Sequence, residues 1–271
     1  MAKSLVENIA MESPLNLPDW ERKLYQPGGG DAFLFYVVFG SFQQPMTISG
    51  SRYQTAGLPE EVSLGLYERE SERETLESFV QGFLARRFAN DEPEIYEKVI
   101  TAPQCLVVSG TVKDPDNLNY LRDTLGVVSA ILDNGGIAIY DPQKFHWWSP
   151  DQWREAVLKP RQPLFNQHVS ILISPEDEKQ GKDGPLWLHT RGMRKFGRPD
   201  LSLRNLPPEK IEAGVDLCNY LIEDQILGLN LQEGQTLDAP GLPFGITCHH
   251  RGDLEDPDFN NVHLEIRLPQ V

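Results

Sequence analysis

The residues best suited to chemistry lie in the last third of the chain, in two separate segments. The first segment reads Trp187-Leu-His-Thr-Arg-Gly-Met-Arg-Lys-Phe-Gly-Arg-Pro-Asp200. Guanidinium groups bind carboxylates and phosphates through parallel N–H groups, and nearby glycines let backbone amides approach the same oxyanion. The segment therefore predicts an anion-binding site. Its candidate ligands are His189, Arg191, Arg194, Lys195 and Arg198.

The same cations also have a structural interpretation. Residues 187–206 carry five basic side chains and one acidic side chain, whereas the whole chain has 40 Asp and Glu against 25 Lys and Arg, a net charge of −15. Surplus carboxylates elsewhere in the chain are available to pair with this basic segment. If the anion site exists, phosphate raises the thermal stability of the protein, and Arg194→Ala removes that response.

The second segment runs from Thr247 to Glu265 and contains three of the six histidines together with five carboxylates. Imidazole and carboxylate groups are ligands of Zn, Fe and Mn, so a metal site or an acid/base site is one hypothesis. Its candidate residues are His249, His250, His263, Asp253 and Asp258. Adjacent histidines on a strand point to opposite faces, which opposes joint binding of one ion. A capped turn and a polar sheet face are the structural alternative.

The surroundings of His263 predict its protonation. A strand over Val262–Leu268 places His263, Glu265 and Arg267 on one face, because side chains alternate along a strand. A nearby carboxylate favours the charged imidazole, so we expect a raised pKa for His263. In a hairpin with a long loop, an imidazole at 249 or 250 is expected across from His263.

The elements that must position these segments are strands and helices without strict alternation. Apolar and aromatic runs predict strands over Ala32–Phe39, Cys105–Val108, Gly136–Tyr140, Phe145–Trp148, His168–Ile173, Leu186–Thr190, Leu201–Leu203, Phe244–His249 and Val262–Leu268. Helical periodicity and capping signals predict helices from Ser71 to Phe83 with a capping box, over Glu94–Val99, from Asp116 to Gly135, from Ser149 to Val157 and from Pro207 to Gly228.

This mixture indicates an α+β fold, with a mixed, largely antiparallel sheet packed by helices. We expect one compact unit or two closely packed halves: an irregular lead-in over residues 1–31, an α+β domain over 32–271, and a possible boundary near 160–166. The strands at 168–173, 186–190 and 262–268 should share one sheet, because the broad apolar stripe of the helix Pro208–Leu227 needs a face to cover.

Composition excludes several classes of protein. No apolar run approaches the ~20 residues of a membrane span, and the first residues do not resemble a signal peptide. The net charge of −15 repels nucleic acid. Three widely spaced cysteines form neither a disulfide framework nor a zinc site, which favours a reducing cytoplasm. Adjacent Trp147 and Trp148 cannot face the same side of a strand, so one of them is expected at a helix contact or a groove.

The segment His189–Asp200 resembles the pattern H/R-T-x-G-M-x-x-F-G-x-P-E/D of a group of uncharacterised bacterial proteins. It is more distantly similar to bacterial suppressor-of-fused-like domains, and the resemblance covers roughly residues 105–206. It implies an α+β domain in the bacterial cytosol, with relatives suspected of protein–protein interaction and some of them acting as toxin-neutralising partners. No catalytic residue is carried over, and the segment Cys248–Glu265 lies outside the resemblance.

Two functions from different classes follow. The favoured one is a non-enzymatic protein-interaction module, because no nucleophile–base pair or metal-ligand spacing is specific. The alternative is a hydrolase that holds an anionic small molecule with the basic segment and uses the C-terminal His/Asp cluster, with or without a metal. The sequence leaves the cofactor unknown and the question of catalysis open. Its partner is a protein or an anionic small molecule, not a nucleic acid or a membrane.

Overall fold

A computed structural model describes residues 3–4, 9–11, 17–160, 163–177 and 183–269. Part of the lead-in predicted over residues 1–31 lies outside these ranges. Contacts divide the chain into two compact units. The first comprises Met1–Trp20, Phe33–Val112 and Asn117–Gln167, and the second comprises Glu21–Ala32, Lys113–Asp116 and His168–Val271. The domain boundary that the sequence predicts near 160–166 stays a prediction.

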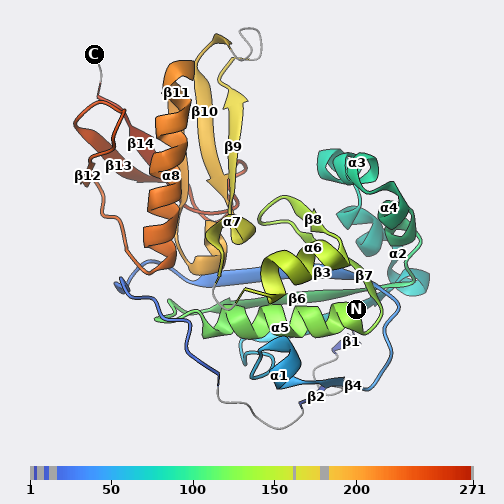
Figure 1. Ribbon diagram of the computed structural model, residues 1–271. Helices are drawn as coiled ribbons and strands as arrows, with labels where there is room; N and C mark the ends of the chain where they lie inside the picture. The colour runs from blue at the N-terminus through green and yellow to red at the C-terminus, as the bar shows by residue number, and fades with distance from the viewer. Residues whose placement is uncertain (1–2, 5–8, 12–16, 161–162, 178–182, 270–271) are drawn as a thin grey trace. The chain divides into compact units, whose positions relative to one another are not determined.

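The first unit is built on a six-stranded sheet (Figure 1). Its order is β1 (Lys3–Ser4), β5 (Val62–Glu68), β6 (Gln104–Val112), β3 (Ala32–Gly40), β7 (Gly136–Asp141) and β8 (His146–Trp148). A second, two-stranded sheet pairs β2 (Ile9–Met11) with β4 (Met46–Ile48) in parallel. The long central strands are rich in aromatic and β-branched side chains, which suit a sheet covered on both faces.

Helices cover this sheet on both sides (Figure 1). One face packs on α2 (Arg69–Phe79), α3 (Gly82–Asp91) and α4 (Pro93–Ile100), and the other on α5 (Asn119–Asp133). Shorter helical segments are α1 (Gly50–Tyr53), α6 (Pro150–Trp153), the π turn Arg154–Leu158 and α7 (Phe165–His168). No helix in the described ranges combines the length and apolar character needed to cross a bilayer.

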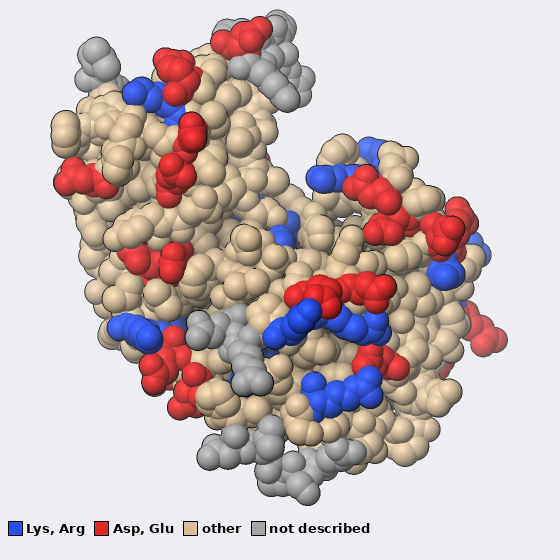
Figure 2. Space-filling model, in the orientation of Figure 1, with Lys and Arg blue, Asp and Glu red and all other residues tan. Residues whose placement is uncertain are grey.

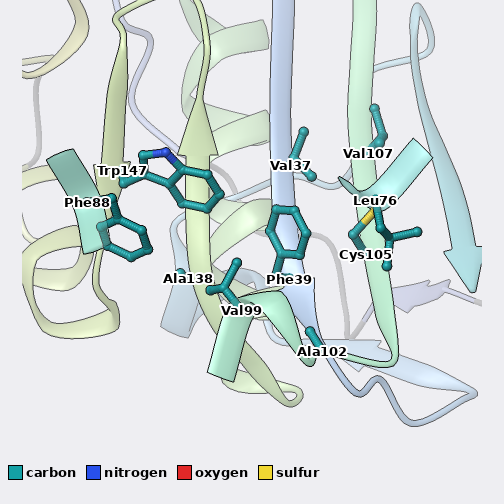
Figure 3. Packing of buried hydrophobic residues seen from close by; sticks show 10 residues of the cluster. All are labelled: Val37, Phe39, Leu76, Phe88, Val99, Ala102, Cys105, Val107, Ala138 and Trp147. Carbon is teal, nitrogen blue, oxygen red and sulfur yellow. The ribbon is translucent and has the colours of Figure 1, made fainter. Parts of the chain in front are cut away.

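Both adjacent tryptophans of β8 are buried, because both faces of the sheet are covered. Trp147 lies between the rings of Phe88 and Tyr140, with ring centroids 4.7 and 4.5 Å away. Figure 3 shows Trp147 and Phe88 beside the side chains of the central strands. Trp148 meets Trp153 edge-on at 5.9 Å, on the opposite face. The two side chains thus extend the hydrophobic core on each side of the sheet.

The second unit contains another six-stranded sheet, covered on one face by α8 (Ile211–Ile226) (Figure 1). Its order is β12 (Thr236–Leu237), β13 (Ile246–Arg251), β14 (His263–Arg267), β11 (Asp200–Leu206), β10 (Leu186–Arg191) and β9 (Ser170–Pro175). All neighbours are antiparallel except β11 and β14. The expected sharing of one sheet by β9, β10 and β14, with α8 packed against it, is confirmed, as is the α+β class.

Several predicted boundaries are wrong. α2 begins at Arg69 rather than Ser71 and has no capping box, since the Ser71 hydroxyl donates to the carbonyl of Glu68 at 3.5 Å. α2 ends at Phe79, and the unpredicted α3 follows. α5 begins at Asn119 with Leu118 as its N-cap, not Asp116. By contrast, the predicted start at Ser149 is confirmed, with reciprocal capping by Gln152.

Candidate functional site

Three cations of the basic segment, Arg191, Lys195 and Arg198, are buried inside the second unit. Lys195 is fully buried on the 3-10 turn Met193–Phe196, and its Nζ donates to the carbonyl of His168 at 3.0 Å. Arg198 is 1% exposed. A buried cation is tolerated only where its donors are satisfied. For Lys195 the acceptor is the protein's own backbone in place of an external oxyanion.

Arg198 joins segments that are distant in the sequence. Its guanidinium donates to the carbonyls of Gln26 (3.1 Å), Gly197 (2.9 Å), Gly228 (2.9 Å) and Leu229 (3.1 Å) and to the Asp114 carboxylate (3.4 Å). Gly29 packs so closely on this guanidinium that an added Cβ would collide with it. The planar fork of Arg198 therefore organises the interior of the unit.

Asp200 is the acceptor at the start of β11. Its carboxylate accepts hydrogen bonds from Thr190 Oγ1 (2.9 Å), Asn261 Nδ2 (2.9 Å) and the backbone N–H of Met193 (3.3 Å). Burial nevertheless outweighs these bonds and raises the pKa of Asp200 to about 6. Asp200 thus ties β10 and Asn261, two residues before β14, to the basic segment.

A cluster of rings occupies the sheet face opposite α8. Trp187 stacks on His189 at 3.9 Å, and Phe259 stacks on His263 at 4.2 Å. The Phe259 ring also meets His189 edge-on at 5.9 Å, so it contacts both imidazoles. The guanidinium of Arg204 lies over the Trp187 ring, 4.0 Å from its centroid. We call these five side chains the ring cluster. Phe259, from the loop 252–262, is 5% exposed and fills the space between the two histidines.

The two imidazoles of the ring cluster are held neutral. Burial, with Arg191 and Arg204 adding to it, lowers the pKa of His189 to about 4. Its Nδ1 is buried without a hydrogen-bond partner. The expected rise at His263 is wrong: burial lowers its pKa despite the attraction of Asp256 and Glu265. A general acid or base needs a pKa near the working pH, so His189 is poorly suited to that role at pH 7.

The candidate metal ligands do not converge. His249 Nδ1 lies 2.7 Å from a Glu233 carboxylate oxygen, and His250 Nε2 lies 2.9 Å from the carbonyl of Leu231. Asp253 caps its own turn by accepting from the N–H of Glu255 at 2.8 Å. Among the described residues, no group of three or more His, Cys, Asp and Glu side chains is arranged to hold a metal ion.

Strand register explains why these residues stay apart. Across the β13–β14 pair, the neighbour of His263 is Arg251, while His249 faces Glu265 and His250 faces Leu264. The expectation of a histidine across from His263 is therefore wrong. Asp258 lies 3.9 Å from the guanidinium of Arg204.

The cysteines do not supply a reactive thiolate. All three are buried, and burial raises the pKa of Cys105 to about 12 and that of Cys218 still further. The thiolate is the nucleophilic form, so these side chains are inert at neutral pH.

Sequence reasoning missed Phe259, Arg204 and Gly29. The Gly28-Gly29-Gly30 run signalled a turn, yet only the fold shows Arg198 packed against it. Phe259 is the lone aromatic residue in an acidic loop, a composition that could have indicated an anchor. Its two imidazole neighbours come from different strands, β10 and β14.

Comparison with known proteins adds no identification: no family model, curated protein or solved structure matches the chain. The resemblance of His189–Asp200 to an uncharacterised bacterial group therefore stays a prediction.

As the pH falls, the titration of His189 and the titration of Asp200 should change the stability of the folded protein in opposite directions. The folded pKa of His189 is about 4 against an ordinary 6.5, so its contribution to stability is lost as the pH falls from 6.5 to 4. The folded pKa of Asp200 is about 6 against 3.8, so its contribution is present below 3.8 and lost as the pH rises through 6. Each effect amounts to about 3 kcal/mol at 1.36 kcal/mol per pKa unit.

We expect His189→Phe, which keeps a ring on Trp187, to gain about 3 kcal/mol relative to wild type between pH 7 and pH 4. Urea denaturation at pH 7, 5.5 and 4 measures this difference. A difference between the two proteins that does not change with pH would contradict the neutral state of His189.

Proposed function

We propose that this protein is a non-enzymatic protein-interaction module whose contact surface lies on the outer side of α8. The observation that carries the proposal is the exposure of Phe244, which is 89% exposed to solvent. An aromatic side chain in water loses the free energy of about 1.5–3 kcal/mol that burial supplies, and a partner's apolar pocket would restore it.

Phe244 belongs to a loop that is fastened to the start of α8, a helix whose outer face is acidic. This loop, residues 238–245, is fastened to the start of α8 because Lys210 Nζ donates to the carbonyl of Gly241 at 2.9 Å. The outer face of α8 presents Glu212, Asp216, Tyr220 and Glu223, all exposed. Figure 2 shows acidic side chains spaced along the position of α8. We call these four residues and Phe244 the α8 surface.

The chemistry of the α8 surface selects a particular partner. Residues 212, 216, 220 and 223 share one side of a helix, because they follow its 3.6-residue period. Carboxylates together with an aromatic anchor favour a partner that has Lys or Arg side chains and an apolar pocket. This choice agrees with the net charge of −15, which attracts basic surfaces at long range.

The interior of the second unit supports the same choice of class. Lys195 and Arg198, which an enzyme would need for an anionic substrate, are bonded to backbone carbonyls. The imidazole of His189 stacks on Trp187 and stays neutral. The two cations and the imidazole that catalysis would use are thus buried, whereas the apolar side chain of Phe244 is exposed. This arrangement suits recognition better than catalysis.

Photo-crosslinking in cells of the native host tests the proposal. With p-benzoylphenylalanine at position 244, we expect a discrete crosslinked protein species that Glu212→Lys with Asp216→Lys largely removes. The matched control carries the crosslinker at Glu155, whose side chain is 71% exposed in the first unit. The same products at both positions, or none at 244, would refute this surface.

A further inference from the structure

The edge strand β9 has an unusual sequence for its position. It closes one side of the second sheet, where β10 is its neighbour, and no described strand pairs with its other side (Figure 1). Such an edge offers backbone N–H and C=O groups to another strand, and native proteins generally protect edges with charged residues or shorten them. β9 has six residues and no charge, and Ile173 is 51% exposed.

The sequence of β9 also reads the same in both directions. Ser170-Ile171-Leu172-Ile173-Ser174 is a palindrome centred on Leu172. When two copies of such a strand pair antiparallel about a two-fold axis at Leu172, each side chain meets its own kind: serine meets serine, isoleucine meets isoleucine and leucine meets leucine. The side chains of Ser170–Ser174 therefore match those of a second β9 at every paired position.

We infer that β9 pairs with β9 of a second copy of this chain and joins two sheets into one across a two-fold axis. An isologous interface uses the same surface on both subunits, and the palindrome in β9 additionally places like side chains opposite each other. A partner of opposite charge would not be selected here, since β9 carries no charge to attract it. This inference is independent of the proposed function, which uses the α8 surface.

Charge sets the salt dependence of this pairing. Each copy carries −15, so two copies repel each other at long range. The strands themselves are uncharged, so added salt screens the repulsion and removes no attraction at β9. Dimerisation should therefore strengthen as the NaCl concentration rises, the reverse of an association held by ion pairs.

Molar mass measured by light scattering over a concentration series of the full chain tests the inference. We expect a species of twice 30.7 kDa. Ile173→Lys should shift it to the monomer, whereas Leu254→Lys, at a loop side chain that is 54% exposed, should leave the dimer intact. Both substituted side chains are exposed, so the fold should tolerate both changes.

Disulfide trapping tests the register. Directly opposed residues of an antiparallel pair have Cα atoms about 4.5–5.5 Å apart, within the range for a disulfide. Leu172→Cys should therefore crosslink two copies faster than Ile173→Cys, because only position 172 meets itself. Cys105, Cys218 and Cys248 are buried and should not compete.

Three results would overturn the inference. One is a monomer at every concentration and salt level. Another is a dimer that survives Ile173→Lys or is lost with Leu254→Lys. The third is a monomer whose β9 amides are protected from hydrogen exchange, which would mean that another segment of this chain occupies the edge.

Discussion

Arg198→Met and Arg198→Lys should each destabilise the second unit by at least about 3 kcal/mol, since removing one partner leaves buried groups unsatisfied. The guanidinium of Arg198 serves four backbone carbonyls and Asp114. Lysine keeps the positive charge but has a single nitrogen, which cannot replace a planar fork with five N–H groups. If Arg198 were instead an exposed anion ligand, its loss would leave the fold intact.

The unfolding of the second unit can be followed separately. Trp187 is the only tryptophan within Glu21–Ala32, Lys113–Asp116 and His168–Val271. The fluorine NMR signal of 5-fluorotryptophan at position 187, assigned with Trp187→Phe, therefore reports on this unit during urea denaturation.

Arg251→Met is the matched control for Arg198. The side chain of Arg251 is 41% exposed and lies 3.2 Å from Glu265. Exposed ion pairs contribute about 0–1 kcal/mol, so this variant should stay close to wild type. Equal urea midpoints for Arg198→Met and Arg251→Met would refute the structural role of Arg198.

A double-mutant cycle locates the effect at the glycine turn. Gly29→Ala should destabilise the wild type, because the new methyl group collides with the Arg198 guanidinium. The same change should cost less in Arg198→Met, whose flexible side chain can move aside. Additive effects would mean that the two positions do not interact.

The contrast between β14 and Arg198 shows which features the sequence could predict. Alternation along Val262–Leu268 was sufficient to place Leu264 and Ile266 on the face opposite His263, and both are buried. That assignment needs only neighbouring residues and the two-residue period of a strand. The partners of Arg198, such as Gln26 and Gly228, are about 170 and 30 residues away, and no local period indicates them.

His263 illustrates a second limit. Its carboxylate neighbours are visible in the sequence, and taken alone they predict a raised pKa. The opposing effect is loss of solvent beneath Phe259, which depends on how the loop 252–262 folds onto the sheet. Local charge can be read from a sequence, whereas desolvation requires the packed structure.

Phe259→Ala should destabilise the second unit by about 3–5 kcal/mol, the usual effect of removing a buried phenylalanine. Phe259 is 5% exposed and contacts both His189 and His263. Its removal should admit water to the two imidazoles and raise the pKa of each toward its ordinary value. Urea denaturation measures the first effect, and NMR titration of the two histidines measures the second.

Phe244→Ala is the control for this prediction, because it makes the same substitution in the same unit at a side chain that is 89% exposed. Its stability should stay within about 0.5 kcal/mol of wild type, and the histidine titrations should not move. If Phe259→Ala lowered stability without shifting the two pKa values, Phe259 would pack the loop without desolvating the histidines. If neither the stability nor the two pKa values changed, the loop 252–262 would be held by the 2.9 Å hydrogen bond between Asn261 and Asp200 at the end of the loop, rather than by the ring cluster.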